Sequence, residues 1–329
     1  MLHNTAVRLT NPPKGILAAD ESTNSCNARF EKLGIPTTEK KRRQYRELLI
    51  TTPGIEEYIS GYILFDETIR QSTSDGKSFP SVLESKGIDV GIKVDTGTHD
   101  FPNHPGEKTT SGLDGLPERL KEYRAMGATF AKWRAIYSIS KNTPTEDLMK
   151  ENAQSLARYA LDCQAENIVP IIEPEVLFDG NHSIEKSFEV NVRNLDIIFA
   201  EFSTQNVFLG GIILKNSMIM AGKDAPRVDA KKVAEMSLKC LKEHVPENIG
   251  GIVFLSGGQS EEEALRHLNL MHQMGNLPWN LSFSYSRAIQ NPVLKHWAEN
   301  PEDTTGAQSI LIKMAKANSL ASIGQYKPK

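Results

Sequence analysis

The feature that most constrains this chain is a pattern that recurs from Gly15 to Arg287, in which short apolar runs end in polar residues and alternate with longer helical stretches. Most of these runs are continuous rather than alternating, which is typical of parallel strands covered on both faces. The expected strands span residues 15–20, 59–65, 90–95, 129–135, 168–175, 207–215, 250–258 and 280–287. This pattern predicts an α/β fold, a (β/α)8 TIM barrel, with a doubly wound open sheet as the competing fold. We expect residues 1–329 to form a single barrel domain with short N- and C-terminal extensions.

Several connections between the strands have recognisable ends. One helix is expected to begin with Thr143 as its N-cap and Pro144 in its first turn, ahead of a long apolar stripe. A second is expected after Ser260, where acidic residues occupy the first turn. The stretch 37–51 predicts a helix with one charged face. Residues 97–115 are rich in turn formers and predict a long loop.

Charge and cysteine content exclude several classes of protein. The chain has 38 lysines and arginines against 41 aspartates and glutamates, which predicts no nucleic-acid and no membrane partner. No apolar run approaches the length of about 20 residues that a membrane span needs, and the first residues lack the apolar core of a signal peptide. Cys26, Cys163 and Cys240 have neither metal-ligand spacing nor a paired framework. These features predict reduced thiols and a cytoplasmic protein.

The ends of the expected strands carry unusual side chains. The apolar run before Lys215 finishes on that lysine, although lysine is among the residues least often buried. In a barrel, strand ends converge on the rim that holds the active site. The other polar residues expected on that rim are Asp20, Glu21, Ser22, Ser25, Lys93, Asp95, Lys132, Arg134, Glu173, Glu175, Ser256, Gly257, Gly258, Ser284 and Arg287.

Those residue types favour one chemistry. A lysine among other cations and apolar walls loses its proton more readily, and the free amine can attack a carbonyl carbon to form a Schiff base. Neighbouring carboxylates can transfer the protons that this addition and the loss of water require. The segment 256–258 can offer backbone N–H groups to a phosphate, and Arg287 can add a bidentate contact. Lys93, Lys132 and Arg134 indicate a second anionic end of the substrate.

Other chemistries fit these residues less well. A zinc enzyme needs histidine ligands, but the histidines include no HxH or HxxxH pair and none ends a strand. Asp20, Glu173 and Glu175 could hold magnesium, and the lysines on the same rim argue against it. A pyridoxal enzyme also uses a lysine imine, but a substrate with a phosphate at each end accounts for more of the residues expected on the rim. We therefore expect no metal and no cofactor.

Taken together, these stretches resemble the class I fructose-bisphosphate aldolase family. The segments "GILAADES", "GIKVD", "FAKWR", "PIIEPE", "ILK", "FLSGGQSEEEA" and "FSYSRA" occur in the order of the family, and the resemblance runs from about Lys14 to Tyr326. It implies a barrel enzyme of glycolysis and gluconeogenesis that reversibly cleaves fructose 1,6-bisphosphate, through a lysine Schiff base, to dihydroxyacetone phosphate and glyceraldehyde 3-phosphate. The protonated imine is the electron sink, so no metal is needed. The resemblance also implies a homo-oligomer, expected to be a tetramer.

The same resemblance implies a role for each matching residue. Lys215 would be the Schiff-base lysine, Glu173 the acid and base of the imine steps, and Asp20 the base that takes the proton of the C4 hydroxyl. Glu175 and Lys132 would assist with proton transfer and charge. The ketone-side phosphate would be held by Ser256, Gly257, Gly258, Ser284, Ser286 and Arg287. The other phosphate or the sugar hydroxyls would contact Ser22, Ser25, Arg29, Lys93 and Arg134.

The chain departs from the family pattern at a few places. Asn216 follows the lysine where proline is usual, which affects loop stiffness. Ser286 replaces a glycine but keeps its backbone N–H, so we expect a small effect. Ala28 replaces a basic residue beside Arg29, which weakens the second phosphate site. The sequence ends soon after Tyr326, without the longer tail whose terminal tyrosine helps protonate the enamine in animal and plant members.

Two further functions stay open at this stage. The chain could be a catalytically weak paralogue that serves as a scaffold, because fold and function separate easily. It could also be an imine aldolase for another phosphosugar, such as sedoheptulose bisphosphate. Trapping of the imine tests the first alternative, and comparison of turnover on each sugar tests the second.

Overall fold

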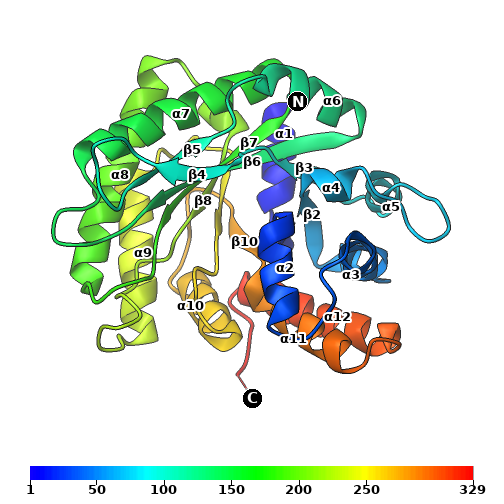
Figure 1. Ribbon diagram of the computed structural model, residues 1–329. Helices are drawn as coiled ribbons and strands as arrows, with labels where there is room; N and C mark the ends of the chain where they lie inside the picture. Colours follow the sequence, from blue (N-terminus) through cyan, green and yellow to red (C-terminus); the bar gives the residue numbers. More distant parts are fainter. Residues whose placement is uncertain (329) are drawn as a thin grey trace.

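The computed structural model describes residues 1–328, and within them parallel strands close into a barrel surrounded by helices (Figure 1). The predicted (β/α)8 barrel is confirmed, and the open sheet is wrong because β10 pairs in parallel with β1. The barrel strands, in their order around the wall, are β1 (Gly15–Ala19), β2 (Ile59–Leu64), β3 (Asp89–Lys93), β6 (Ala128–Tyr137), β7 (Val169–Val176), β8 (Ile213–Asn216), β9 (Gly251–Phe254) and β10 (Leu281–Tyr285).

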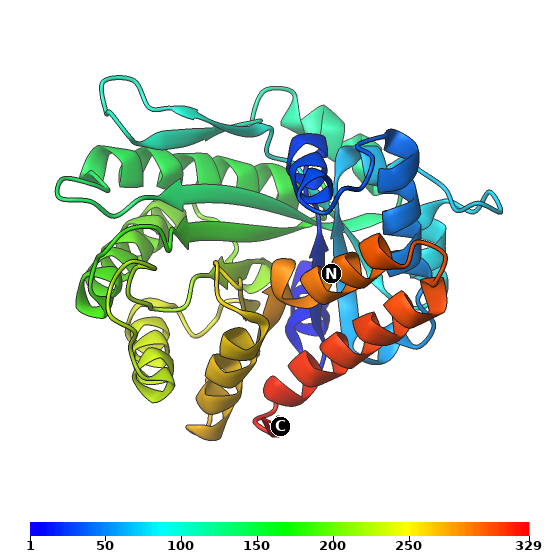
Figure 2. The same cartoon turned by 60° about the horizontal axis from the view of Figure 1, so that its bottom comes forward.

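Helices follow the strands and cover the outside of the barrel (Figure 2). The helix α1 (Leu2–Thr10) precedes the first strand. The helices that come after β1 are α2 (Thr23–Glu31), α3 (Glu39–Thr51), α4 (Asp66–Ile69), α5 (Phe79–Ser85), α6 (Leu116–Ala125), α7 (Glu146–Ala165), α8 (Ile184–Thr204), α9 (Ala230–His244), α10 (Glu261–Gln273), α11 (Arg287–Glu299) and α12 (Thr304–Ala321). Short 3-10 turns, η1 (Ile55–Glu57) and η2 (Leu209–Gly211), precede β2 and β8. The helices expected over 37–51 and after Ser260 are confirmed as α3 and α10.

Packed side chains fill the interior of the barrel. Ile16, Ile63 and Ile171 are fully buried there beside Phe130. The ring of Phe130 leaves no room opposite it, because a Cβ added at Gly91 would lie 2.2 Å from the ring. The closed interior is therefore a core, and the chemistry is confined to the strand ends.

The N-terminal helix α1 closes the base of the barrel. Its residues Ala6 and Leu9 are fully buried and belong to the interior cluster. The Ser60 hydroxyl donates to the Leu9 carbonyl at 2.7 Å and so attaches the end of α1 to β2. The segment before β1, expected as an extension, is thus part of the core.

The prediction of a long loop over 97–115 is wrong. The chain instead forms an antiparallel hairpin of β4 (Gly97–Asp100) and β5 (Lys108–Ser111). Thr110 donates to the Arg134 carbonyl at 2.8 Å, which holds the hairpin against β6. The strands are short and polar, so their hydrophobic pattern is too weak to be recognised in the sequence.

The predicted N-cap of α7 is also wrong. The cap is Thr145, whose hydroxyl accepts a hydrogen bond from the Leu148 N–H at 3.3 Å, and Thr143 and Pro144 lie before the helix. The Thr145 N–H and hydroxyl both donate to the buried carboxylate of Glu107, at 2.7 and 2.6 Å. Glu107 comes from the hairpin, and a local sequence pattern cannot reveal this partner.

Other boundaries differ only slightly. The run 207–215 is a strand only from Ile213, because η2 occupies its first half. Cys26, Cys163 and Cys240 are buried free thiols, as predicted. Among residues 1–328, no helix is both long and apolar enough to span a membrane.

Candidate active site

A cavity of about 390 Å³ opens where the barrel strands end and their loops begin. It is lined by almost the whole predicted set of site residues: Asp20, Ser22, Ser25, Arg29, Lys93, Lys132, Arg134, Glu173, Glu175, Lys215, Ser256, Gly257, Ser284, Ser286 and Arg287. The predicted residue outside its lining is Gly258, which faces a second cavity on the other side of the same loop. The strand ends therefore bring together residues that lie up to 267 positions apart in the chain.

A row of alternating charges crosses the floor of this cavity. The Lys215 Nζ lies 3.0 Å from Glu173 Oε1, and the Lys132 Nζ lies 3.0 Å from Glu173 Oε2 and 2.8 Å from Asp20 Oδ2. Each side chain comes from a different strand end, and each residue is less than a tenth exposed. The sequence predicts cations around Lys215, but its nearest charged neighbour is the Glu173 carboxylate, which separates it from Lys132.

Burial and pairing set the protonation of this row. Burial alone would raise the pKa of Glu173, but the charges of Lys132 and Lys215 outweigh it and hold that pKa below its usual value. The same balance lowers the pKa of Asp20, chiefly through Lys132. Burial would lower the pKa of Lys132, but Asp20 and Glu173 raise it above its usual value. At neutral pH the row therefore holds two carboxylates on either side of a protonated Lys132.

One end of the cavity offers donors that the protein does not use. The Ser284 hydroxyl oxygen is buried and has no hydrogen-bond partner among residues 1–328. Arg287 begins α11 and makes no ion pair within the same part of the chain. Gly257 lines this end with a φ angle of 50°, in a turn of the kind whose backbone N–H groups can bind an anion. This arrangement suits a phosphate group.

The opposite end has its cations already paired. Arg29 forms an ion pair with Glu21, and Arg134 forms one with Glu175. The Lys93 Nζ lies 2.6 Å from Asp95 Oδ1. Ser22 and Ser25 are joined by a hydrogen bond of 3.1 Å between their hydroxyls. A second anion can bind here, but it must compete with carboxylates that are already in place.

The sequence places Glu21 and Asp95 on the rim without giving either a role. Glu21 accepts hydrogen bonds from Arg46 at 2.7 Å and from Ser286 at 2.7 Å, in addition to its ion pair with Arg29. Burial would raise its pKa, but Arg46 and Arg29 lower it. Glu21 thus joins α2, α3 and the start of α11. The signal available in the sequence is its place in "AADES". Its partner Arg46 lies on α3, the helix predicted to have one charged face.

Tyr326 lies away from this cavity. Its hydroxyl donates to Glu262 at 2.7 Å and its N–H donates to Asn269 at 2.8 Å, so it packs along α10. Partial burial, together with the hydrogen bond to the Glu262 carboxylate, raises the pKa of Tyr326 to about 12.

Comparisons with known proteins agree on one family. The family model described as fructose-bisphosphate aldolase class-I matches residues 1–329. A probable fructose-bisphosphate aldolase class 1 of Xanthomonas campestris pv. campestris is 50% identical over 331 residues, covering 99% of this chain and 98% of the relative. The cytosolic fructose-bisphosphate aldolase 4 of Arabidopsis thaliana is 47% identical, covering 98% of this chain and 82% of the relative. The fructose-bisphosphate aldolase of Plasmodium falciparum, solved with TRAP and a small-molecule inhibitor, superposes with a TM-score of 0.98 at 44% identity, over 100% of this chain and 95% of that one.

Proposed function

We propose that this chain, which belongs to the class I fructose-bisphosphate aldolase family, performs its aldol chemistry on the amine of Lys215. As a class I aldolase, it cleaves fructose 1,6-bisphosphate reversibly, through a lysine Schiff base and without a metal. The observation that carries the residue assignment is the buried row Lys215, Glu173, Lys132 and Asp20, with contacts of 2.8 to 3.0 Å. A row of this kind places a base beside the nucleophile and a second base farther along the substrate.

The first step is formation of the imine. The Lys215 ammonium passes a proton to Glu173 Oε1 at 3.0 Å, and the free amine attacks the C2 carbonyl carbon of the ketone. Loss of the positive charge of Lys215 removes one of the three charges that lower the pKa of Glu173, beside those of Lys132 and Arg134, so the carboxyl can then hold the proton. In the adduct one N–H proton moves to the new alkoxide oxygen and gives the neutral carbinolamine. Glu173 then returns its proton to the carbinolamine hydroxyl, which leaves as water and yields the protonated imine.

The second step breaks the C3–C4 bond. Asp20 accepts the proton of the C4 hydroxyl, the C4 oxygen becomes a carbonyl, and the bonding electrons move into the imine to give the enamine. The lowered pKa of Asp20 keeps it ionised and ready to accept. Lys132 stays protonated between Asp20 and Glu173 and balances their charge. Glu175 assists indirectly, because its ion pair orients Arg134.

The phosphates bind at the two ends of the cavity. Ser256, Gly257, Ser284 and Arg287, with the backbone of Ser286, hold the ketone-side phosphate. Ser22, Ser25, Arg29, Lys93 and Arg134 contact the other phosphate or the sugar hydroxyls. Gly258 faces away from the cavity, so we assign it the shaping of the loop rather than a direct contact.

Borohydride trapping tests this proposal. The enzyme is incubated with dihydroxyacetone phosphate, a chelator and borohydride, and the reduced adduct is located by peptide mass mapping. We expect one adduct, on Lys215, and none in Lys215→Met. A control variant, Lys231→Met, replaces an exposed lysine of α9 and should give the wild-type adduct. An adduct on another lysine, or none on the folded enzyme, would refute the assignment.

We further propose a cytoplasmic homotetramer. The support for the assembly is the family resemblance, and the support for the location includes a plant relative named as cytosolic. Light scattering coupled to gel filtration tests the assembly, and a mass of one or two chains would contradict it.

A further inference from the structure

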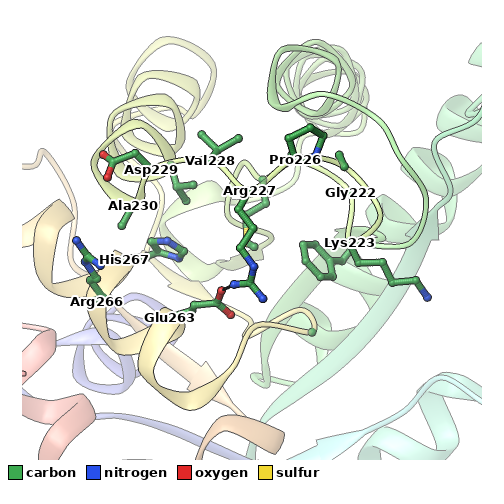
Figure 3. A pocket seen from close by; sticks show the side chains of 16 residues that line it. Gly222, Lys223, Pro226, Arg227, Val228, Asp229, Ala230, Glu263, Arg266 and His267 are labelled. Carbon is green, nitrogen blue, oxygen red and sulfur yellow. Dashed lines mark hydrogen bonds and ion pairs between the residues drawn. The ribbon is translucent and has the colours of Figure 1, made fainter.

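A second cavity of about 360 Å³ lies behind the loop that ends the catalytic cavity (Figure 3). The two cavities share no lining residue within residues 1–328, yet Gly257 lines one and Gly258 lines the other. The second cavity is bounded by the loop that follows β8 and by the first turns of α10. It is close in volume to the catalytic cavity and can accept a ligand of similar size.

The far wall of this cavity is fixed in place. The Gly222 N–H donates to the His182 carbonyl at 2.9 Å, and the Lys223 N–H donates to the Phe178 carbonyl at 2.8 Å. A Cβ at Gly222 would lie 2.2 Å from the Gly180 carbonyl oxygen, so glycine is needed where the two loops meet. These contacts keep the cavity open without a ligand.

The opposite wall presents a buried acceptor. His267 is 5% exposed and lines the cavity, and Figure 3 shows its imidazole on the wall facing Arg227. The Gln259 Nε2 donates to the Ser256 carbonyl at 2.9 Å, so Gln259 Oε1 must accept the 2.6 Å hydrogen bond from His267 Nδ1. The proton is therefore on Nδ1, and Nε2 is an acceptor with no partner in the described part of the chain.

The charge state of His267 strengthens this conclusion. Burial lowers its pKa to about 4, so the ring is neutral at physiological pH. A neutral acceptor on a side chain that lines a cavity gains from a ligand that donates a hydrogen bond, such as a hydroxyl group.

The rim of the cavity is charged, and its described lining residues include the basic Lys223, Arg227 and Arg266 and the acidic Asp229 and Glu263. Lys223 pairs with Asp179 at 2.5 Å. Arg227 pairs with Glu263, whereas Arg266 has no ion pair within residues 1–328. Asp229 is occupied as the N-cap of α9, where it accepts from the Lys231 N–H at 2.9 Å. The unpaired Arg266 therefore makes an anionic group the favoured charge of a ligand.

We propose that this cavity is a second ligand site, for a small anion that carries at least one hydroxyl, and that its occupancy is transmitted to the phosphate-binding loop. The path consists of three hydrogen bonds. His267 Nδ1 donates to Gln259 Oε1. The backbone N–H and the side-chain Nε2 of Gln259 both donate to the Ser256 carbonyl, at 3.0 and 2.9 Å. The ligand hydroxyl donates to His267 Nε2 and its anionic group pairs with Arg266. Restraint of His267 restrains the backbone that shapes the ketone-side phosphate site.

Equilibrium titration tests the site on enzyme whose catalytic cavity is filled by the reduced dihydroxyacetone phosphate adduct. Adduct formation is verified by mass before the titration, so failure of the proposed imine is seen separately. The probes are glycerol 3-phosphate, which has hydroxyls, and propyl phosphate and inorganic phosphate, which lack a neighbouring hydroxyl. We expect one saturable site for glycerol 3-phosphate and about tenfold weaker binding of the other two.

Variants separate this site from non-specific binding. Arg266→Ala, on the surface, and His267→Phe should each weaken the binding of glycerol 3-phosphate about tenfold. Arg158→Ala, which replaces an exposed arginine on α7, should leave it unchanged. No saturable binding to the blocked enzyme, or equal binding by Arg266→Ala, would overturn the site. Equal binding of all three probes would overturn the hydroxyl requirement. Should the adduct not form, the same variants are compared on the unmodified enzyme.

Hydrogen exchange tests the transmission to the loop. In the blocked enzyme, glycerol 3-phosphate should slow amide exchange in residues 255–260, and it should fail to do so in His267→Phe at a concentration that gives equal occupancy. Binding without any change in exchange over these residues would refute the coupling.

Discussion

The two ends of the catalytic cavity both carry basic and hydroxyl side chains but differ in what those groups already bind. At the ketone-side end, Arg287 has no ion pair and the buried Ser284 hydroxyl has no partner, among residues 1–328. At the other end, Arg29, Lys93 and Arg134 each contact a carboxylate. The ketone-side end therefore has free donors for an anion, whereas the cations of the other end are already neutralised by carboxylates of the protein.

This difference sets what each end contributes to binding. A phosphate that meets unpaired donors gains the whole of each charge-assisted hydrogen bond. A phosphate that meets paired cations gains only the difference between its own contact and the one it displaces. The ketone-side end should therefore anchor the substrate, and the cations of the other end should serve the fold as well as the substrate.

The largest expected effect is on folding, from Glu21→Gln. The change keeps the shape but leaves Arg46, whose side chain is 3% exposed, without its charge partner. Loss of a buried ion-pair partner costs about 3 kcal/mol, more than 100-fold in the folding equilibrium. Denaturant unfolding measures this loss. Arg287→Ala is the matched control and should unfold like the wild type, so equal stability of both variants would contradict the structural role of the paired end.

Low pH should remove the difference in unfolding free energy between the wild type and Glu21→Gln. The pKa of Glu21 is lower in the folded chain than in the unfolded one, so its contribution to stability is complete above the unfolded value, about 4.3. That contribution is lost as the pH falls from there through the lower folded value. The gap in unfolding free energy between wild type and Glu21→Gln should accordingly be constant from pH 7 to 5 and shrink below pH 4. A gap that grows on acidification would show that the lowered pKa is wrong.

The next effect is on catalysis, from Arg287→Ala. Removal of an unpaired cation from a phosphate should lower kcat/KM about 100-fold, or about 3 kcal/mol, mainly through KM. Arg29→Ala should lower it only about tenfold, because the cost of breaking the Glu21 pair disappears together with the arginine. Steady-state kinetics on fructose 1,6-bisphosphate measure both variants. A greater loss in Arg29→Ala would reverse the comparison between the two ends.

The substrate can be truncated instead of the protein. A ketose that keeps the ketone-side phosphate and lacks the one at C6 gives up only the contacts at the paired end. We expect its kcat/KM to be about tenfold below that of the bisphosphate in the wild-type enzyme. In Arg29→Ala the two substrates should become more alike. An unchanged ratio in that variant would place the second phosphate somewhere other than beside Arg29.

A smaller effect is expected from Ser284→Ala. The hydroxyl is buried without a partner, so its removal costs the folded state nothing and should leave or slightly raise the melting temperature. Loss of one neutral donor to the phosphate should raise KM about fivefold, close to 1 kcal/mol. Thermal unfolding and kinetics on the same preparation test both halves. A clear drop in melting temperature would mean that the hydroxyl has a structural partner.

The sequence predicts the barrel and most of the site because both depend on patterns that are local in the chain. Continuous apolar runs mark the strands, and the polar residue at the end of each run falls on the rim whatever the details of packing. For the same reason Lys215, Glu173, Lys132 and Asp20 could be placed on one rim before their contacts were known.

What the sequence does not reveal depends on partners that are distant in the chain. Thr145 is the N-cap because Glu107 on the hairpin accepts its hydrogen bonds. The role of Glu21 comes from its contacts with Arg46 and with Ser286, and Ser286 lies 265 positions away in the chain. Periodicity also fails for β4 and β5, whose residues are largely polar. Pairing of charges across the cavity is a property of the folded chain, so the contrast between the two ends could not be foreseen.

The smallest effect should come from Ser286→Gly. Ser286 contacts groups at both ends of the catalytic cavity. The Ser286 hydroxyl donates to Glu21 at 2.7 Å and accepts from Gln290 at 3.2 Å, while its backbone belongs to the ketone-side phosphate site. Glycine can adopt the backbone angles of Ser286, φ −107° and ψ −83°, without strain, and the backbone N–H remains. We expect KM for fructose 1,6-bisphosphate to rise about threefold, because one hydrogen bond that positions the loop is lost. Ser286→Ala should behave like Ser286→Gly, since both remove only the hydroxyl. A large rise in KM in the glycine variant alone would instead assign the effect to backbone freedom at the start of α11. The hydrogen bond from Ser286 to Glu21 would then have no part in positioning Arg287.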